Sequence, residues 1–167
     1  MSSADVFRLK LESPIGTITV TGSASGITAV GFDDNAPEEG NHADVPGVVR
    51  DCAQQLSEYF EGRRREFDVK LNASGTQFQQ RVWRALLAIP FGQTTTYGAL
   101  AADLGDPKTI RAVGRANGQN PIAIIVPCHR VIGSDGSLVG YGGGLWRKQW
   151  LLAHEGRAVQ PPLFPFD

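Results

Sequence analysis

Residues 97–117 read YGALAADLGDPKTIRAVGRAN, and this stretch decides the fold of the second half of the chain. We predict a short helix over Tyr97–Leu104, a tight turn at Gly105–Pro107 and a second helix over Lys108–Asn117. Two short helices joined by a glycine-containing turn are the helix-turn-helix pattern. Ordinary packed helix pairs show it too, so a second helix whose basic face is merely solvated is the alternative interpretation.

An apolar segment flanks this helix pair on each side. Before it, Thr76 is expected to cap a helix that continues to Ile89 with one apolar face. After it, the turn Asn120-Pro121 leads into the apolar run Ile122–Val126, which indicates a buried strand. The apolar helix positions are Phe78, Val82, Leu86 and Ile89.

Short antiparallel strands are predicted in the first 32 residues, which are rich in Val, Ile, Thr and Phe and interrupted by turn residues. The polar, acidic stretch Asp33–Asp44 is predicted to be a surface loop. Glu66–Leu71 could add one more strand. The three N-terminal strands are expected at Val6–Leu11, Ile15–Thr21 and Gly26–Phe32.

A helix is predicted from Pro46 to just before Gly62, because apolar residues recur there every four positions. The stretch Asn72–Gly75 is the candidate domain boundary. We therefore expect an α+β protein, in which an N-terminal domain (1–74), a small antiparallel sheet plus a helix, packs on a mostly helical C-terminal helix-turn-helix and active-site domain (75–167). The apolar helix positions are Val48, Cys52, Leu56 and Phe60.

The composition is that of a globular protein in a reducing compartment. Of its 167 residues, 41% are hydrophobic and 20% are charged, and two cysteines are too few for a disulfide framework. The N-terminus lacks a secretory signal, and no apolar run approaches the roughly 18 residues that span a membrane. We expect a cytoplasmic monomer. No Cys/His cluster has the spacing of a zinc site, so we expect no structural metal.

Charge is divided unevenly along the chain. Residues 1–75 hold 7 Lys and Arg against 12 Asp and Glu, whereas residues 76–150 hold 8 against 3, although the net charge is only −1. This asymmetry indicates either an anionic partner for the second half or two oppositely charged lobes that attract each other.

The apolar run delivers a thiol and an imidazole, Cys128 and His129, to its end. A cysteine is nucleophilic as the thiolate, and an adjacent base promotes that form. Neighbours in an extended strand point to opposite sides, so the pair cooperates only if the chain turns there or water links them. An inert core cysteine is the alternative for Cys128, and Cys52, on an apolar helix face, is expected to be one.

A carboxylate is needed to orient the imidazole. Glu155 is the candidate and would complete a Cys–His–Glu relay, while the neighbouring His154 is either an alternative partner or a surface residue. The loop Gly140–Gly144 contains one tyrosine among glycines, which lets a ligand ring approach the main chain closely. It lacks the pattern of a phosphate-binding loop, so nucleotide hydrolysis is unsupported.

These pieces together resemble the O6-alkylguanine-DNA alkyltransferases. The similarity rests on Pro127–Val131, with Asn120 eight residues before Cys128, followed by Tyr141–Gly144 and the late Glu155. The similarity extends over about Gly75–Gly156. The family members that the chain resembles are of the bacterial single-polypeptide type. The N-terminal part matches only in its strand–helix layout, which in this family is ribonuclease H-like.

The resemblance implies a role for each matching residue of the chemical site. Cys128 would attack the alkyl carbon on guanine O6 in a single, irreversible turnover. His129 would remove the thiol proton through a water, supported by Glu155, and Tyr97 would donate a proton toward the departing guanine. Asn120 would brace the turn, and no cofactor or metal is implied. The guanine pocket would comprise Val131, Tyr141, Gly142 and Gly143, completed by Gly144.

The resemblance also implies how double-stranded DNA is bound, through the minor groove with the alkylated base flipped out. Arg111 would enter the space that the base leaves, and O4-alkylthymine is a further implied substrate. The other implied DNA contacts are Arg81, Thr96, Lys108, Ala112, Gly114 and Arg115.

Two other function classes compete with this interpretation. A helix-turn-helix DNA-binding regulator would need neither Cys128 nor Glu155. A thiol hydrolase with a Cys–His–Glu triad would turn over repeatedly, and it leaves the basic second helix without a role. Mass gained by the chain itself discriminates alkyl transfer from both.

Overall fold

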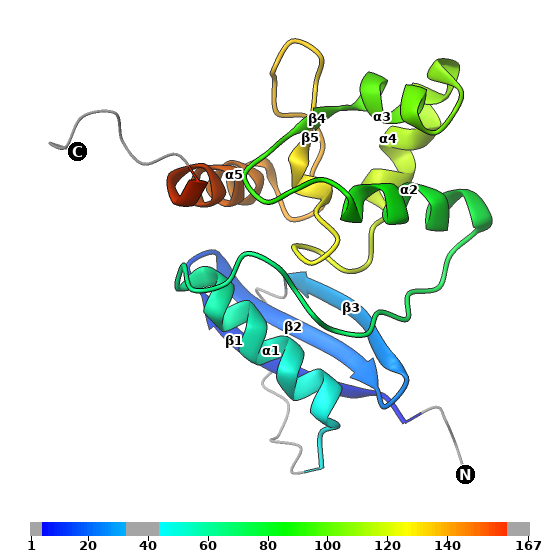
Figure 1. Ribbon diagram of the computed structural model, residues 1–167. Helices are drawn as coiled ribbons and strands as arrows, with labels where there is room; N and C mark the ends of the chain where they lie inside the picture. Colours follow the sequence, from blue (N-terminus) through cyan, green and yellow to red (C-terminus); the bar gives the residue numbers. More distant parts are fainter. Residues whose placement is uncertain (1–4, 33–43, 160–167) are drawn as a thin grey trace, which may run out of the picture. The chain divides into compact units, whose positions relative to one another are not determined.

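The computed structural model describes residues 5–32 and 44–159, with side chains up to Gly156, so the predicted loop Asp33–Asp44 lies outside the described residues except for Asp44. The chain divides into two compact units, Met1–Ser74 with Pro121–Ile125 and Gly75–Asn120 with Val126–Asp167 (Figure 1). Its elements are β1 (Phe7–Ser13), β2 (Gly16–Ser23), β3 (Gly26–Phe32), α1 (Gly47–Phe60), α2 (Gln77–Leu87), β4 (Thr95–Thr96), α3 (Tyr97–Asp103), η1 (Pro107–Thr109), α4 (Ile110–Gly118), η2 (Cys128–Arg130), β5 (Val131–Ile132) and α5 (Leu145–Val159).

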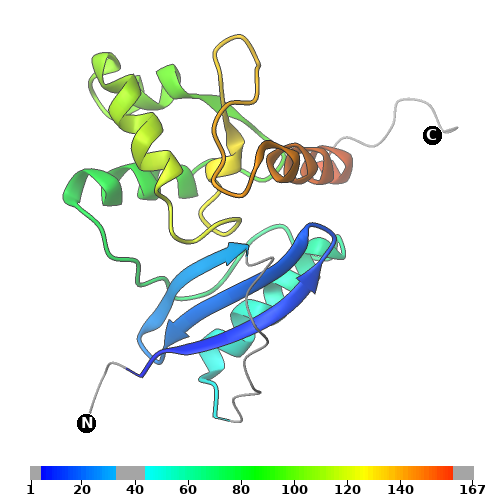
Figure 2. The same cartoon turned by 180° about the vertical axis from the view of Figure 1, so that it is seen from behind.

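The first unit is an antiparallel sheet in the order β1-β2-β3, covered on one face by α1 (Figure 2). The three predicted strands are confirmed, with bounds shifted by up to two residues. Residues Ile18, Val20, Ile27 and Val30 of the sheet are fully or almost fully buried. A mixed α+β fold is therefore confirmed.

The predicted apolar face of α1 was partly wrong. Cys52 and Leu56 are buried, but Val49 and Tyr59 complete the buried face in place of Val48 and Phe60. A strict four-residue repeat drifts about 40° around a helix at each step, because a turn has 3.6 residues. Alternating three- and four-residue spacings keep the buried face toward the sheet.

Two predicted strands are absent from the described chain. Glu66–Leu71 contributes a single bridge, between Leu71 and Ile27. The run 122–126 is largely buried as expected, but it makes only one bridge, between Ile122 and Val30. Residues 121–125 group with the first compact unit.

The reason lies in the backbone of that run. Ile124 has a φ of 72°, a left-handed conformation that costs energy in a β-branched residue. Hydrogen bonds from Ile125 N to Ala123 O (2.8 Å) and from Cys128 N to Val126 O (2.8 Å) close tight turns. The apolar run therefore turns sharply toward Cys128 instead of extending.

The second unit begins at a capped helix. Thr76 accepts a hydrogen bond from Gln79 N (3.1 Å) and the Gln79 side chain accepts one from Thr76 N (2.9 Å), so α2 starts where the sequence predicts. It ends at Leu87, two residues before the predicted end. Its buried residues are Val82, Trp83 and Leu86, with Ile89 just beyond it.

The helix-turn-helix prediction is confirmed, with one correction. Lys108 lies in η1 and not on the second helix, because Asp106 caps a 3₁₀ turn through a hydrogen bond from Lys108 N to its Oδ1 (2.9 Å). The second helix, α4, starts only at Ile110. A short parallel pairing of β4 with β5 was not predicted. In the described part of the chain, no helix is long and apolar enough to cross a bilayer.

Candidate active site

The candidate nucleophile sits on a turn of the second unit. Residues Cys128–Arg130 form the 3₁₀ turn η2, so the chain does turn where the cooperation of Cys128 with His129 requires it. The Asn120 amide donates to Val126 O (2.8 Å) and ties this turn to the end of α4. The backbone N–H of Val131 donates to Cys128 O, which closes the turn from the other side.

Three buried side chains form a charged network beside the thiol. His129 is 0% exposed and its Nε2 donates to Glu155 Oε2 (2.8 Å). Arg130 donates from Nε to Glu155 Oε1 (2.8 Å) and from Nη2 to Glu155 Oε2 (2.9 Å). A further hydrogen bond joins Arg130 Nη1 to Ile89 O (2.7 Å). The carboxylate from α5, 1% exposed, is therefore held by two residues of η2.

The electrostatics of this network define the histidine tautomer. Burial alone would raise the pKa of Glu155, but its hydrogen bonds with His129 and Arg130 and the positive charge of Arg130 hold that pKa well below its usual range. Burial lowers the pKa of His129, despite the opposing effect of Glu155. Because an ionised carboxylate only accepts, a neutral His129 carries its proton on Nε2. The other ring nitrogen, Nδ1, is then a base, and among the described residues it has no hydrogen-bond partner.

Arg130 explains how the imidazole stays neutral beside a carboxylate. Its guanidinium supplies the positive charge that balances Glu155, so His129 need not be protonated to compensate a buried anion. Arg130 was not among the predicted site residues. Its place in the segment Pro127–Val131 was the available signal, because a buried carboxylate normally has a cationic partner.

The two thiols lie in different environments. Cys128 is 7% exposed, and burial raises its pKa, while a hydrogen bond with Asn120 and the charge of Lys148 act in the opposite direction. Cys52 is fully buried on α1, and burial raises its pKa to about 12. Among the described residues, groups that stabilise a thiolate lie beside Cys128 but not beside Cys52.

A buried lysine that was not predicted, Lys148, lies beside Val131 and Tyr97. Lys148 on α5 is fully buried, and its Nζ donates to Val131 O (2.7 Å) and Val139 O (2.9 Å). The Tyr97 hydroxyl donates to the same Val139 oxygen (3.0 Å). Burial and the nearby Cys128 raise the pKa of Tyr97, so the phenol keeps its proton at neutral pH. A fully buried lysine is uncommon, and no pattern in the sequence distinguishes it from surface lysines.

The predicted pocket residues lie near this lysine in sequence. Val131 is buried, Tyr141 and Gly143 are half-buried, and Gly142 is exposed. Arg147, which is itself buried, donates from Nη1 to Gly143 O (3.0 Å) and stacks over the Trp146 ring at 4.7 Å. Glu155, not His154, is the partner of His129. His154 instead stacks on Trp150, with ring centroids 4.8 Å apart.

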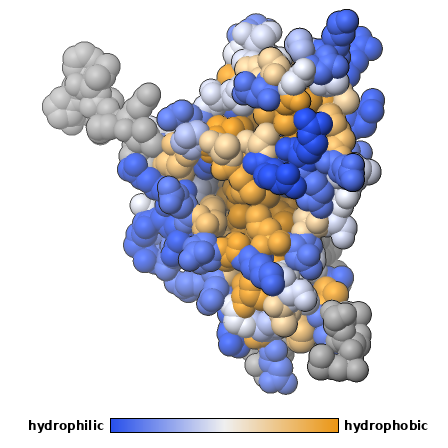
Figure 3. Space-filling model, turned by 45° about the vertical axis from the view of Figure 1, so that its right-hand side comes forward, coloured by the Kyte–Doolittle hydropathy of each residue, from blue (hydrophilic) through white to orange (hydrophobic). Residues whose placement is uncertain are grey.

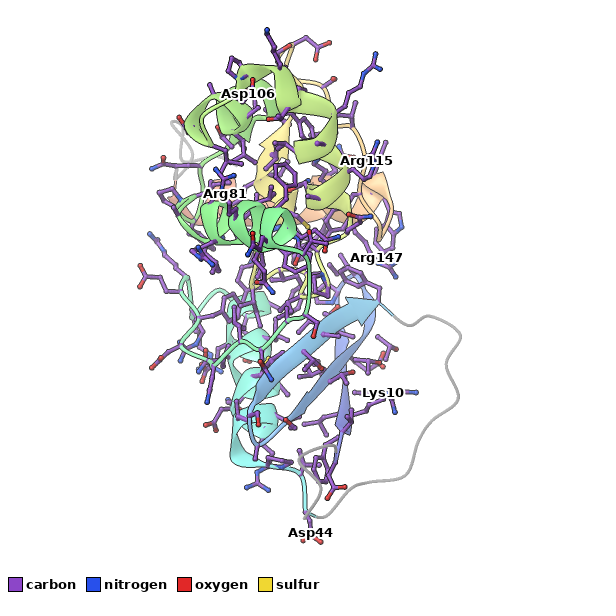
Figure 4. The ribbon with its side chains drawn as sticks, turned by 90° about the vertical axis from the view of Figure 1, so that its right-hand side faces the viewer. Lys10, Asp44, Arg81, Asp106, Arg115 and Arg147 are labelled. Carbon is purple, nitrogen blue, oxygen red and sulfur yellow. The ribbon has the colours of Figure 1, made fainter. Side chains whose placement is uncertain are left out.

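The predicted DNA contacts surround α3 and α4. Hydrophilic side chains lie among apolar ones at the upper end of the face shown in Figure 3, and Arg81 on α2 and Arg115 on α4 are labelled in Figure 4. Arg111, Arg115 and Lys108 are exposed. Arg81 is also exposed, but its Nη2 donates to Leu104 O (2.8 Å) and so links α2 to the end of α3.

The remaining predicted contacts have local structural roles. Thr96 Oγ1 accepts from Ala99 N (3.0 Å) and caps α3. Ala112 is half-buried, and Gly114 faces Tyr97, whose Cδ1 would lie 3.7 Å from an added Cβ. Within the described residues, no group of three or more His, Cys, Asp or Glu could hold a metal ion.

Two family profiles match the chain. Residues 77–157 match "6-O-methylguanine DNA methyltransferase, DNA binding domain", and residues 6–73 match "6-O-methylguanine DNA methyltransferase, ribonuclease-like domain". Together they account for most of the sequence.

Curated relatives and solved structures agree with these profiles. A methylated-DNA–protein-cysteine methyltransferase of Mycobacterium bovis is 48% identical over 94% of this chain and 96% of its own length. One from Methanosarcina acetivorans is 48% identical over 87% of this chain and 95% of its own. The crystal structure of Mycobacterium tuberculosis O6-methylguanine methyltransferase has a TM-score of 0.83 and 46% identity, covering 98% of this chain and 100% of that one. A structure of the M. tuberculosis protein in complex with DNA has a TM-score of 0.79 and 49% identity over 89% and 92%.

Proposed function

The chain belongs to the 6-O-methylguanine DNA methyltransferase family, and we propose that Cys128 is the cysteine to which it transfers the alkyl group. It is a DNA-repair transferase that moves the alkyl group of a damaged base to one of its own cysteines. The observation that carries the assignment is the buried network of His129, Glu155 and Arg130 on the turn that holds Cys128. Cys52 lies in the other unit, where burial keeps it protonated.

The reaction balances without a cofactor. The thiol proton of Cys128 passes through a water to Nδ1 of His129, whose Nε2 proton stays on the imidazole and remains hydrogen-bonded to Glu155 Oε2. The thiolate attacks the alkyl carbon, the carbon–O6 bond breaks, and its electron pair leaves with guanine. Tyr97 donates its hydroxyl proton to the guanine ring. The proton that His129 accepted then replaces it on the Tyr97 oxygen. The product thioether has no good leaving group, so each chain reacts once.

DNA engagement is assigned to the second unit. A thiol at 7% exposure cannot reach a base inside a duplex, so the target nucleotide must rotate out, at a cost of a few kcal/mol. We propose that the exposed Arg111, second residue of α4, fills the vacated space from the minor groove, as inserted side chains do when they kink and open DNA. Lys108 and Arg115 would contact phosphates. We also propose O4-alkylthymine as a substrate.

The proposed domain roles follow the two family profiles. Residues 75–167 would carry DNA binding and chemistry, and residues 1–74 would form the ribonuclease-like domain. We propose that the protein acts as a monomer in the cytoplasm, where a prokaryotic chromosome lies. The regulator and the hydrolase are not favoured: the first leaves the buried network unexplained, and the second leaves the exposed arginines of α4 without a role.

The proposal is tested by intact mass after mixing the protein with duplex DNA containing O6-methylguanine. The wild type should gain one methyl group per chain, Cys128→Ser should gain none and still bind DNA, and Cys52→Ser should behave as wild type. Peptide mapping of the methyl to Cys52 would overturn the assignment of Cys128. Repeated turnover without mass gain would favour the hydrolase.

A further inference from the structure

The turn that follows α2, residues 89–92, is a part of the second unit that the mechanism above does not use. Its sequence is Ile-Pro-Phe-Gly. Gln93 N donates to Pro90 O (3.1 Å) and closes the turn. Gly92 has a φ of 80°, in the left-handed region that favours glycine. Ile89 is buried, whereas Phe91 and Gly92 are half-buried. The turn therefore has a defined conformation that depends on its glycine.

This turn contacts both members of the ion pair between Glu155 and Arg130. The Ile89 carbonyl accepts from Arg130 Nη1 (2.7 Å), and the guanidinium carbon of Arg130 lies 5.8 Å from the centre of the Phe91 ring. The backbone N–H of Gly92 donates to Glu155 Oε1 at 3.4 Å, a long hydrogen bond. A guanidinium within about 6 Å of an aromatic ring is attracted to the face of that ring. The guanidinium and the carboxylate are thus each held by the turn as well as by each other.

The position of the guanidinium determines where the imidazole finds its acceptor. Arg130 binds Glu155 with two nitrogens, Nε at 2.8 Å and Nη2 at 2.9 Å. Such a two-pronged contact fixes the plane of the carboxylate. His129 Nε2 donates to the same carboxylate at 2.8 Å. Because the turn holds the guanidinium, it also sets the geometry of the acceptor that orients His129.

The chain segment that begins with this turn is joined to the active-site turn at a second place. Beyond residue 92 the chain continues into β4, where Thr95 and Thr96 pair in parallel with Val131 and Ile132 of β5. Strand β5 directly follows η2, which carries Cys128. Residues 89–96 are therefore bonded to the chain around the nucleophile at both ends, once through Arg130 and once through the β4–β5 pairing.

We propose that Phe91 is a positioning residue for the base His129 and acts through Arg130 and Glu155. This inference rests on the proposed function of His129 and Cys128. The ring holds the guanidinium against the carboxylate, whose charge is then balanced without a proton on the imidazole. When the ring is lost, the guanidinium moves away from Glu155. The less compensated carboxylate then favours protonation of His129, and a protonated imidazole cannot accept the thiol proton.

The test is the pH dependence of the single-turnover rate of Phe91→Leu on free O6-benzylguanine. Transfer needs neutral His129, so the rate falls as the pH drops through the pKa of that imidazole. Among the described residues, the charged groups that act on this pKa are Glu155, Arg130 and Lys148. A weaker contact between Arg130 and Glu155 raises the His129 pKa, so the acid limb of the profile should move up by at least about half a pH unit.

The maximal rate of Phe91→Leu should also fall about fivefold, because the imidazole is less well oriented. Phe91→Tyr keeps the ring and should restore both the rate and the pH midpoint of the wild type. Phe60→Leu is the matched control. It makes the same change at a half-buried phenylalanine of α1, whose ring centre lies 5.3 Å from that of Tyr59. It should lower the melting temperature without moving the rate or the midpoint.

A double-mutant cycle with Glu155→Gln separates positioning from a general structural effect. If Phe91 acts through Glu155, then Phe91→Leu should have little further effect on the rate in the Glu155→Gln background. An unchanged pH midpoint in Phe91→Leu, an equal shift in Phe91→Tyr, or an undiminished additional loss in the double variant would overturn the inference. Failure of the wild type to gain a methyl from duplex DNA containing O6-methylguanine would instead overturn the proposed function.

Discussion

Replacing Glu155 by glutamine removes the charge on which the buried network depends. The carboxylate accepts from His129 at 2.8 Å and from Arg130 at 2.8 and 2.9 Å. A glutamine has one acceptor oxygen, and its NH₂ group would face a donor of Arg130 or His129. Arg130 would keep the Ile89 carbonyl but lose its counter-charge in a buried site.

Two magnitudes follow from this geometry. Removing one partner of a buried ion pair costs about 3–5 kcal/mol, and both partners here are at least nine-tenths buried, so little solvent screening reduces the effect. The imidazole also loses the acceptor that fixes its proton on Nε2. We therefore expect Glu155→Gln to slow alkyl transfer by roughly 10²–10⁴-fold, as for other supports of a general base.

The pH dependence has a definite sign. Because the folded pKa of Glu155 lies below its unfolded value, its contribution to stability is present above about pH 4.3 and is lost as the pH falls further. Urea unfolding of the wild type should therefore show a stability loss below about pH 4 that is smaller in Glu155→Gln.

The assay pairs single-turnover transfer, followed by intact mass, with urea unfolding at neutral pH. Glu58→Gln is the control, because Glu58 makes an ion pair of the same length, 2.8 Å with Arg64, at a more exposed site. It should leave the transfer rate unchanged and alter stability little. Wild-type transfer rates in Glu155→Gln would show that His129 is oriented by something else, and the reasoning would be refuted.

Two further predictions concern DNA and the pocket loop. Arg111→Ala should slow repair of duplex DNA much more than transfer from free O6-benzylguanine, because only the duplex requires an extruded base. Lys108→Ala should mainly weaken duplex affinity and flatten the salt dependence of that affinity. Equal losses of rate on both substrates for Arg111→Ala would contradict insertion. Arg147→Met should raise about tenfold the O6-benzylguanine concentration that gives half the maximal transfer rate, because it releases the Gly143 carbonyl. Trp146→Phe, which keeps an aromatic ring under the Arg147 guanidinium, should leave that concentration unchanged. An unchanged concentration in Arg147→Met would show that Arg147 does not shape the pocket loop.

Features that depend on neighbouring residues could be predicted from the sequence. The start of α2 follows from the reciprocal bonds of Thr76 and Gln79, three residues apart. The helix-turn-helix follows from a glycine turn between two short periodic segments. The thiol–imidazole pair follows from adjacency along the chain, and Glu155 could be named as a partner from the family resemblance.

Other features depend on residues that are distant in the sequence, and only the tertiary structure decided them. The run 122–126 was apolar enough for a strand, but Ile124 adopts a left-handed conformation that hydrophobicity does not encode. Arg130, Lys148 and Asn117 looked like ordinary polar residues, and each is buried only because partners from other elements surround it.

By itself, the sequence determined the order of the elements and the residue types of the site, since helix caps, turns and apolar periodicity act over a few positions. The tertiary structure decided which charges meet. Glu155 reaches His129 and Arg130 across 26 and 25 residues, and only folding brings such groups into a site of low dielectric constant, where burial and hydrogen bonds set their pKa values.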